Sequence, residues 1–389
     1  MKRIVKSLFV ILLTACLLLG TVQTASAAAA PVNDASGSTE RLPCISAVLM
    51  DAATGQVLFE QNANEALPPA SVTKVMTLLL VMEAIDEGKI SLQDTVTAGA
   101  KAAAMGGSQV YLKEGEQMSV EEMLKCVIIA SANDCAVALA EYVAGSEEAF
   151  VRKMNARAAD LGMKNTHFEN TNGLDDTAQN HVTSALDIAI MSRALISHKK
   201  ILEYSGIWMD TIRNGTFGLT NTNRLVRFYP GCTGLKTGST AKAKFCISAT
   251  AERDGLSLIC VVMGAESRDI RNETATKLLD NGFANYAAFA AEGEKLSVPM
   301  RGGVSADCEV GYEAFAAVVP KGKIARVEKR VELPETLKAP IAEGEAVGAV
   351  VYRLDGEEVG RVPILALQSV ERINFSTLFC RLLSQFFII

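Results

Sequence analysis

The chain of 389 residues lacks most of the features that mark metal-binding, nucleic-acid-binding and membrane-spanning proteins. It has only three histidines, His167, His181 and His198, and their spacing fits no metal site. The net charge is -6 and the basic residues form no blocks, which argues against nucleic acid as a partner. Beyond the N-terminal region, no apolar run reaches the roughly 20 residues that a transmembrane helix needs. We therefore expect a protein that acts through its own side chains, without a metal or other cofactor.

The N-terminus has the pattern of a secretory signal peptide, residues 1–27. Basic residues occupy the start, an apolar core spans residues 8–19, and Ala25-Ser26-Ala27 forms a small-residue cleavage site. Cys16 could instead belong to a lipoprotein processing site. Because the apolar core continues past Cys16, we favour cleavage after Ala27.

Cysteine usage leaves two readings open for an exported protein. Nine cysteines are present, and removal of the signal peptide leaves eight, an even number that is compatible with disulfides. However, Cys126, Cys135, Cys246 and Cys260 lie in apolar runs, where a free thiol behaves as a small hydrophobic group. We expect most of the cysteines to be buried free thiols.

The mature sequence divides into two domains and a terminal helix. Residues 28–42 are rich in alanine, serine and glycine and are predicted to be a linker. Residues 43–290 alternate between strand-like and helix-like runs and are numerous enough for a large core. Residues 293–367 are short valine-rich runs broken by glycine and proline, which predicts a small all-β domain. Residues 368–389 return to a helical period.

Several elements of the first domain have clear sequence signals. Asp254-Gly255 predicts a hairpin, and Ser119 with Glu122 predicts a capping box at a helix start. The predicted strands are 45–49, 56–60, 243–251 and 256–264. The predicted helices are 72–85, 119–130, 135–144, 146–162, 183–197 and a closing helix at 270–290.

A serine and a lysine lie together at the start of the first of these helices. The prolines Pro68 and Pro69 end the preceding segment, so Ser71 should lie at the helix start and Lys74 one turn further on, on the same side. A lysine in the first turn opposes the helix dipole and, if buried, loses solvation. Both effects favour its neutral amine. Such an amine could take a proton from the serine hydroxyl, which predicts a nucleophile and its base.

This Ser-x-x-Lys pattern is weak alone, because the chain also has it at 197–200 and 239–242 and serine is an ordinary helix cap. A second pattern, Ser131-Ala132-Asn133, lies at a break between two apolar helices, where a simple interhelical turn is the alternative. A third, Lys236-Thr237-Gly238, lies at or just before a strand edge. There it could present a hydroxyl and backbone to an extended ligand, or form an ordinary basic turn.

The three patterns in this order are more specific than any one of them. The same order occurs in penicillin-binding proteins and class A β-lactamases. Ala70–Thr77, Asn172–Asp175 and Gly234–Gly238 narrow the match, and the chain resembles low-molecular-weight penicillin-binding proteins, the serine-type D-alanyl-D-alanine carboxypeptidases. The resemblance covers the chain from about residue 45 onward. It implies an α+β fold: a β-lactamase-like antiparallel sheet flanked by helices, a small all-β domain and a C-terminal amphipathic helix.

The resemblance also implies roles for individual residues. The catalytic residues would be Ser71 as nucleophile, Lys74 as general base and Ser131 as the group that passes a proton to the leaving amine. The substrate-binding residues would be Asn133, Lys236, Thr237, Gly238, Ser239 and Arg271. The charge of Lys236 would help to keep Lys74 neutral, and Arg271 would bind the free carboxylate of the leaving D-alanine. The chain departs from the family pattern at Ala132, where glycine is frequent, and at Ser239, where some members carry histidine.

Two other functions fit parts of this pattern. A class A β-lactamase shares the three motifs, and Glu169 could be its deacylating base. However, Glu169 lies in a stretch that matches the carboxypeptidase loop, and about 100 residues follow the closing helix. A non-catalytic protein that only binds muropeptides is the second alternative, and the intact motif set argues against it.

The resemblance finally implies partners and location. We expect peptidoglycan stem peptides ending in D-Ala-D-Ala and β-lactam antibiotics to bind the site. In residues 370–389, apolar residues recur at steps of three and four, which favours a helix that lies in a membrane interface. A helix docked on the β domain or on a second copy of the chain is the alternative. The protein should therefore be exported and attached to the outer face of the cytoplasmic membrane.

Overall fold

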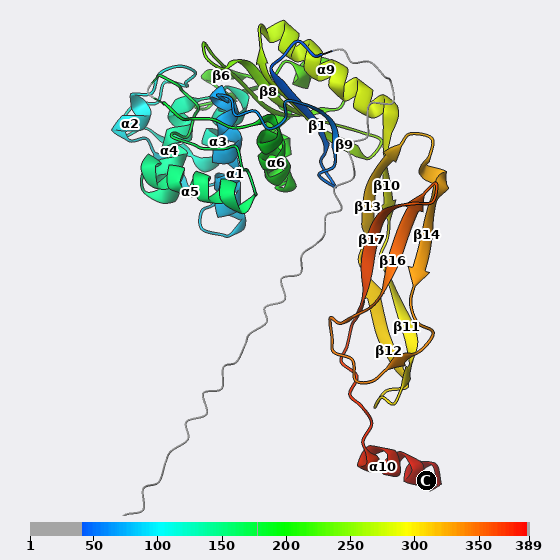
Figure 1. The fold of residues 1–389 in the computed structure, drawn as a ribbon. Coiled ribbons are helices and arrows are strands. Elements are labelled where there is room, and N and C mark those ends of the chain that lie inside the picture. Colours follow the sequence, from blue (N-terminus) through cyan, green and yellow to red (C-terminus); the bar gives the residue numbers. More distant parts are fainter. Residues whose placement is uncertain (1–40, 177, 387–389) are drawn as a thin grey trace, which may run out of the picture.

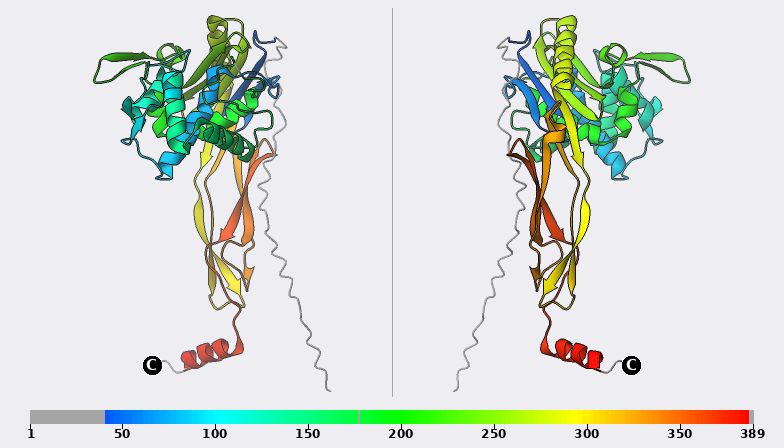
Figure 2. Two further views of the ribbon diagram at one scale, coloured as in Figure 1. Left: turned by 90° about the vertical axis from the view of Figure 1, so that its left-hand side faces the viewer. Right: turned by 90° about the vertical axis from the view of Figure 1, so that its right-hand side faces the viewer.

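The computed structural model describes residues 41–176 and 178–386, which form two domains and a terminal helix (Figure 1). We call residues 41–285 the N-terminal domain and residues 286–373 the β domain. The β domain extends away from the N-terminal domain as a narrow stalk, and helix α10 (Phe375–Phe386) lies at its far end (Figure 2). The helix is therefore remote from the N-terminal domain.

The N-terminal domain is built on a five-stranded antiparallel sheet with the strand order β2-β1-β9-β8-β7. Its strands are β1 (Ser46–Asp51), β2 (Val57–Gln61), β7 (Cys232–Thr240), β8 (Lys244–Arg253) and β9 (Leu256–Ala265). The four predicted strands are confirmed, and Asp254 and Gly255 have the positive φ angles, 51° and 77°, of a two-residue hairpin turn. Because β7 is an edge strand, its free side can face a ligand.

Both faces of this sheet are covered by helices, which explains why its strands are apolar on both sides. Val48 and Met50 of β1 belong to the core beneath α1 and α6, whereas Ala47 and Leu49 pack in the core beneath α9. The main helices are α1 (Lys74–Asp86), α3 (Val120–Ile129), α4 (Asn133–Ala144), α5 (Glu147–Asp160), α6 (Ala185–Ser197) and α9 (Arg268–Asn285). Shorter elements are α2 (Ala100–Ala103), α7 (Lys200–Ser205), α8 (Leu225–Phe228), β3 (Thr95–Thr97), β4 (Gln117–Ser119), β5 (Met209–Ile212) and β6 (Phe217–Thr220).

Three local features of the helical layer position polar side chains. A 3-10 turn, η1 (Ala70–Thr73), precedes α1 and carries Ser71. The predicted capping box is present at the start of α3, where Ser119 Oγ accepts the Glu122 N–H at 3.2 Å. Between α3 and α4 the chain breaks at Ser131, whose φ angle is 62°. This is a left-handed conformation that is uncommon outside glycine.

The sequence predicts a closing helix at 270–290, but α9 ends at Asn285. Residues Tyr286–Ala291 form strand β10 instead, and all six pair with β13 (Phe315–Pro320). The alanine-rich sequence of this segment suits a helix, but strand pairing and the packing of Phe289 against aromatic rings of the β domain outweigh that local preference. The β domain therefore begins at Tyr286, before the predicted boundary at 293.

The β domain combines the β10-β13 pair with a six-stranded sheet of order β14-β16-β17-β12-β11-β15. The strands of that sheet are β11 (Glu294–Arg301), β12 (Asp307–Tyr312), β14 (Val327–Glu332), β15 (Leu337–Lys338), β16 (Ala346–Leu354) and β17 (Glu357–Ala366), and a 3-10 turn, η2 (Ile324–Arg326), precedes β14. A separate apolar core, centred on Val310, Val350 and Tyr352, holds this domain together.

The terminal helix is shorter than the predicted range of 368–389. Val370 is buried in the β-domain core and its backbone pairs with Ile341, while the Ile373 N–H donates to Gly302. These contacts hold the segment before Phe375 as part of the β domain. None of the helices in the described part of the chain combines the length and apolar character that crossing a bilayer requires.

The cysteines of the described residues are free thiols, and six of the eight are buried. This confirms the prediction that most of them act as small hydrophobic groups. The signal peptide with Cys16, and most of the predicted linker, lie outside the described residues.

Candidate active site

The first part of the site is the turn that leads into α1. The Nζ atom of Lys74 lies 2.9 Å from Oγ of Ser71 and donates to the carbonyl oxygen of Asn172 at 2.8 Å. Lys74 is fully buried, while Ser71 keeps part of its surface open. The turn therefore holds an amine within proton-transfer distance of an accessible hydroxyl.

The surroundings of Lys74 favour its neutral form. Burial is the largest cause that holds the pKa of Lys74 well below its ordinary value, and the nearby charge of Lys236 lowers it further. The carboxylate of Asp134 acts in the opposite direction. However, that carboxylate already accepts the backbone N–H groups of Val110 and Leu112. A neutral amine beside a hydroxyl can act as a base.

A second serine and lysine face each other across the site. The break between α3 and α4 carries Ser131, and Lys236 Nζ on strand β7 lies 2.9 Å from Ser131 Oγ. Lys236 also donates to the carbonyl oxygen of Thr237 at 2.9 Å and is fully buried. Burial, followed by the charge of Arg271, lowers the pKa of Lys236 to about 7. This lysine can therefore gain or lose a proton near neutral pH.

Asn133 lies at the first residue of α4, beside Ser131. Its Nδ2 donates to the carbonyl oxygen of Gly106 at 2.7 Å, which fixes the orientation of the amide. Its Oδ1 is buried and has no hydrogen-bond partner among the residues that the structure describes. A buried acceptor without a donor is costly, so this oxygen is suited to receive an N–H from a bound ligand.

Strand β7 passes directly over the start of α1. A Cβ atom at Gly238 would lie 2.8 Å from the backbone nitrogen of Ser71 and 2.9 Å from that of Val72. Glycine therefore allows an approach that other residues would prevent. Thr237, the preceding residue, donates its hydroxyl to Thr222 Oγ1 at 2.8 Å.

A cavity of about 720 Å³ connects these groups. Its lining residues come from the turn η1, the segment after α2, the α3–α4 break, the segment from Trp208 to the end of α8, strands β7 and β8, and the start of α9. They are Ser71, Ser108, Ser131, Trp208, Thr220, Asn221, Thr222, Arg224, Phe228, Thr237, Gly238, Ser239, Phe245, Arg268 and Arg271. The three sequence motifs thus meet at one open cavity, although they are far apart in the chain.

Arg271 forms one end of this cavity. Its guanidinium group is largely buried and contacts Asn272 Oδ1 at 2.9 Å and the carbonyl oxygen of Cys246 at 3.4 Å. Burial, followed by the charge of Arg268, lowers the pKa of Arg271 to about 10. A buried guanidinium next to a second arginine provides a strongly attractive position for a carboxylate.

The other two Ser-x-x-Lys patterns do not form such a pair. Ser197 donates its hydroxyl to the carbonyl oxygen of Ala194, and Lys200 forms an ion pair with Glu203. In the third pattern, Ser239 lines the active-site cavity, but Lys242 donates to the carbonyl oxygen of Asp175.

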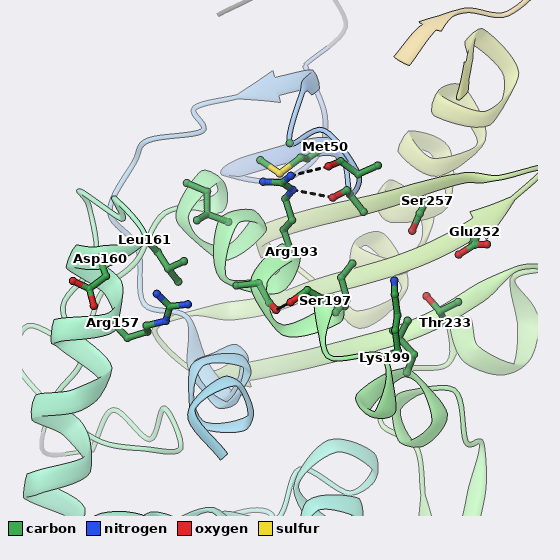
Figure 3. A pocket seen from close by; sticks show the side chains of 17 residues that line it. Met50, Arg157, Asp160, Leu161, Arg193, Ser197, Lys199, Thr233, Glu252 and Ser257 are labelled. Atoms are coloured by element: carbon green, nitrogen blue, oxygen red, sulfur yellow. Dashed lines mark hydrogen bonds between the residues drawn. The ribbon is translucent and has the colours of Figure 1, made fainter. Parts of the chain in front are cut away.

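Ser197 instead belongs to a second cavity of about 810 Å³ (Figure 3). Arg193 spans part of this cavity and donates to the carbonyl oxygens of Ala52 and Ala53 at 2.8 and 2.7 Å. None of the serines and lysines of the three motifs, Ser71, Lys74, Ser131 and Lys236, lines this second cavity.

Some residues of the site were not singled out from the sequence. The carbonyl oxygen of Asn172 contacts Lys74, although only the family pattern Asn-Gly-Leu-Asp marked this stretch. Thr222 and Arg224 line the cavity through a segment without a recognised motif. Glu169, the candidate base of a β-lactamase, accepts the backbone N–H groups of Gln179 and Asn180 and does not line the cavity.

Family profiles and named relatives match most of the chain. A profile of the family described as D-alanyl-D-alanine carboxypeptidase matches residues 33–267, and a profile of the penicillin-binding protein 5 C-terminal domain matches residues 297–372. The chain is 42% identical to the D-alanyl-D-alanine carboxypeptidase DacF of Bacillus subtilis, over 85% of this chain and 87% of that protein. It is 36% identical to DacC of Escherichia coli, over 89% and 90% of the two chains.

Solved structures show the same likeness. Penicillin-binding protein 5 of Haemophilus influenzae superimposes with a TM-score of 0.78 at 32% identity, covering 86% of this chain and 99% of that one. The ampicillin-bound penicillin-binding protein D2 of Listeria monocytogenes superimposes with a TM-score of 0.58 at 32% identity, covering 63% and 100%. The chain therefore belongs to the D-alanyl-D-alanine carboxypeptidase family of serine hydrolases.

Proposed function

We propose that this carboxypeptidase removes the terminal D-alanine from peptidoglycan stem peptides through an acyl-enzyme on Ser71. The observation that carries the proposal is the 2.9 Å contact between Ser71 Oγ and the buried amine of Lys74, whose pKa lies well below its ordinary value. The neutral amine takes the hydroxyl proton as the oxygen attacks the penultimate D-alanine carbonyl.

The developing oxyanion and the leaving group need separate partners. We assign the oxyanion to the backbone N–H groups of Ser71 and Ser239, because β7 lies directly against the nucleophile turn at Gly238. Ser131 passes a proton to the leaving amine. Lys236 Nζ, 2.9 Å from Ser131 Oγ, supplies that proton or stabilises the negative charge that develops on Ser131 Oγ. Water then hydrolyses the acyl-enzyme.

The substrate is held on both sides of the scissile bond. Asn133 accepts a substrate amide N–H on its unpartnered Oδ1. The free carboxylate of the terminal D-alanine binds the Thr237 hydroxyl and the Arg271 guanidinium at the end of the cavity. β-Lactam antibiotics carry a carboxylate beside their reactive carbonyl, so we assign them to the same positions. A β-lactam ligand is consistent with the similarity to penicillin-binding protein D2, whose structure has ampicillin bound.

A paired assay tests this proposal. A fluorescent penicillin should label Ser71 stoichiometrically, and a peptide ending in D-Ala-D-Ala should release D-alanine with many turnovers, whereas penicillin should turn over slowly. Rapid penicillin hydrolysis with no peptide hydrolysis would instead identify a β-lactamase. Absence of both reactions in folded protein would identify a binding protein.

We also propose that the protein acts outside the cytoplasm, attached to the membrane surface by α10. The support is a secretory pattern in residues 1–27, outside the described residues, and the exposed apolar side chains of α10. Phe375 and Phe379 are 81% and 51% exposed and their rings stack on each other. Exposed aromatic side chains on a helix at the end of a stalk are suited to insertion among lipid headgroups.

A further inference from the structure

His181 is a buried imidazole that no step of the proposed mechanism uses. Its Nδ1 atom lies 3.0 Å from the backbone nitrogen of Glu169, and its Nε2 atom lies 2.7 Å from Oγ1 of Thr73. A backbone N–H can only donate, so Nδ1 must be the acceptor. The neutral ring therefore carries its proton on Nε2 and donates it to Thr73.

The hydrogen bonds continue in the same direction towards the nucleophile. Because Thr73 Oγ1 accepts from the ring, its own proton is free to donate, and it lies 2.8 Å from the carbonyl oxygen of Ala70. Ala70 directly precedes Ser71. A directed chain thus leads from the Glu169 N–H through His181 and Thr73 to the carbonyl in front of the nucleophile.

That carbonyl belongs to a strained turn. Ala70 has a φ angle of 48°, which an alanine adopts only when its surroundings impose it. The loop backbone at Gly173 also lies against the turn, because a Cβ atom there would be 1.8 Å from the Ala70 carbonyl oxygen. The same loop presents the Asn172 carbonyl to Lys74. The loop and the threonine hydroxyl together enclose the peptide unit that directs Ser71.

We propose that His181 is a positioning residue for acylation. Its neutral ring orients the Thr73 hydroxyl, which holds the Ala70 carbonyl and keeps Ser71 Oγ directed at Lys74. This inference rests on the proposed role of Ser71 as nucleophile. His181 itself does not contact the reacting atoms.

The chain of hydrogen bonds requires an uncharged ring. A second ring proton would place Nδ1–H against the Glu169 N–H, so two donors would face each other. Burial, the largest cause, lowers the pKa of His181 to about 4. Glu169 and Asp175 raise that pKa, whereas His167 and Lys74 lower it. The ring is therefore neutral at neutral pH, and the chain is intact there.

Variants of Thr73 provide the first test. Thr73→Val keeps the shape of the side chain but removes the hydroxyl, and it should slow acylation by fluorescent penicillin about tenfold, as expected for a lost hydrogen bond. Thr73→Ser restores a hydroxyl and should recover most of the rate. Melting temperatures of both variants separate this effect from unfolding. Equal acylation rates in folded Thr73→Val and the parent would overturn the proposal.

Variants of His181 provide the second test, since glutamine and asparagine each keep one half of the ring's contacts. His181→Gln extends an amide N–H to the position of Nε2, whereas His181→Asn places an oxygen at the position of Nδ1. We expect faster acylation in His181→Gln than in His181→Asn. Combining His181→Asn with Thr73→Val should add no further loss, because both break the same chain. Additive losses, or the reverse order of rates, would contradict the proposal.

Two controls complete the experiment. His198→Gln changes a histidine that bonds Asp86 away from the site and should acylate at the parent rate. Mass spectrometry should find the label on Ser71 in every variant that reacts. If the parent protein itself fails to label at Ser71, the proposed function is wrong. If the parent labels and Thr73→Val labels equally fast, only the role of His181 is wrong.

Discussion

The N-terminal domain and the terminal helix α10 both place side chains in unfavourable surroundings. The N-terminal domain buries Lys74 and Lys236 completely, although ammonium groups are strongly hydrated. The terminal helix α10 exposes Phe375 and Phe379, although aromatic side chains gain most from burial. Both arrangements oppose the folding preference of the residues concerned.

The difference between the two regions separates catalysis, which depends on the buried lysines, from attachment, which depends on the exposed aromatic rings. The buried lysines are surrounded by fixed partners, so burial changes their pKa and turns them into reagents. The exposed rings have only each other as aromatic partners in the described residues, which makes them suited to a partner outside the chain. The following predictions test whether the N-terminal domain performs the chemistry alone and whether α10 only attaches the protein to the membrane surface.

The largest effect is expected at the nucleophile and its base. Ser71→Ala and Lys74→Ala should lower peptide hydrolysis by a factor on the order of 10⁵ or more, because each removes one member of the proposed nucleophile–base pair. D-alanine release measures peptide hydrolysis, and penicillin labelling measures formation of the acyl-enzyme. Ser197→Ala, in the exposed pattern beside Lys200, is the matched control and should react like the parent. Labelling that survives in Ser71→Ala but disappears in Ser197→Ala would reverse the assignment.

The second prediction concerns pH and the lysine of β7. The pKa of Lys236 is lowered to about 7, so its amine is charged below and neutral above that value. If the charged form assists Ser131 and attracts the substrate carboxylate, peptide kcat/KM should fall as the pH rises through about 7. Lys236→Arg keeps its charge to much higher pH and should remove this basic limb, even if its maximal rate is lower. A basic limb at the same pH in Lys236→Arg would assign it to another group.

A smaller and more selective effect is expected at Arg271. Arg271→Ala should weaken peptide hydrolysis more than β-lactam acylation, because the strained lactam ring supplies reactivity of its own. Loss of a charged hydrogen-bond partner corresponds to about 2 to 3 kcal/mol of transition-state binding. Arg271→Lys keeps a charge without the forked geometry and should be intermediate. Equal and small losses for both substrates would show that Arg271 binds no carboxylate.

The reactive residues of the site could be predicted from the sequence, but the groups that contact and orient them could not. Ser71, Lys74, Ser131 and Lys236 could be found because short motifs set their residue types and order. The carbonyl of Asn172 and the hydroxyl of Thr222 could not, since they meet the motif residues only after long segments fold together. Such contacts depend on tertiary packing and leave no local pattern.

The errors in the predicted fold also come from tertiary contacts that leave no local pattern. Residues 286–290 are alanine-rich and belong to the predicted closing helix, but pairing with β13 makes Tyr286–Ala291 a strand. Val370 fits the helical period of the terminal segment, yet it is buried in the β-domain core. Local periodicity identified long elements well and failed where a short segment joins a neighbouring domain.

The smallest effect on catalysis is expected from removal of α10, and this prediction separates the two ends of the molecule. The cut must follow Ile373, because Val370 is buried and pairs with Ile341, whereas α10 starts at Phe375. The truncated mature protein should keep its melting temperature and its kcat/KM for a soluble peptide, but it should no longer sediment with anionic liposomes. A cut after Gln368 would also remove the Val370 side chain, whose burial contributes about 1.5 to 3 kcal/mol, and should lower the melting temperature. Phe375→Asp with Phe379→Asp in the full mature chain keeps the helix and should release it from liposomes as the cut does. If both variants still bind liposomes, α10 does not carry the membrane attachment. If the cut after Ile373 unfolds the β domain, α10 is part of the fold of that domain.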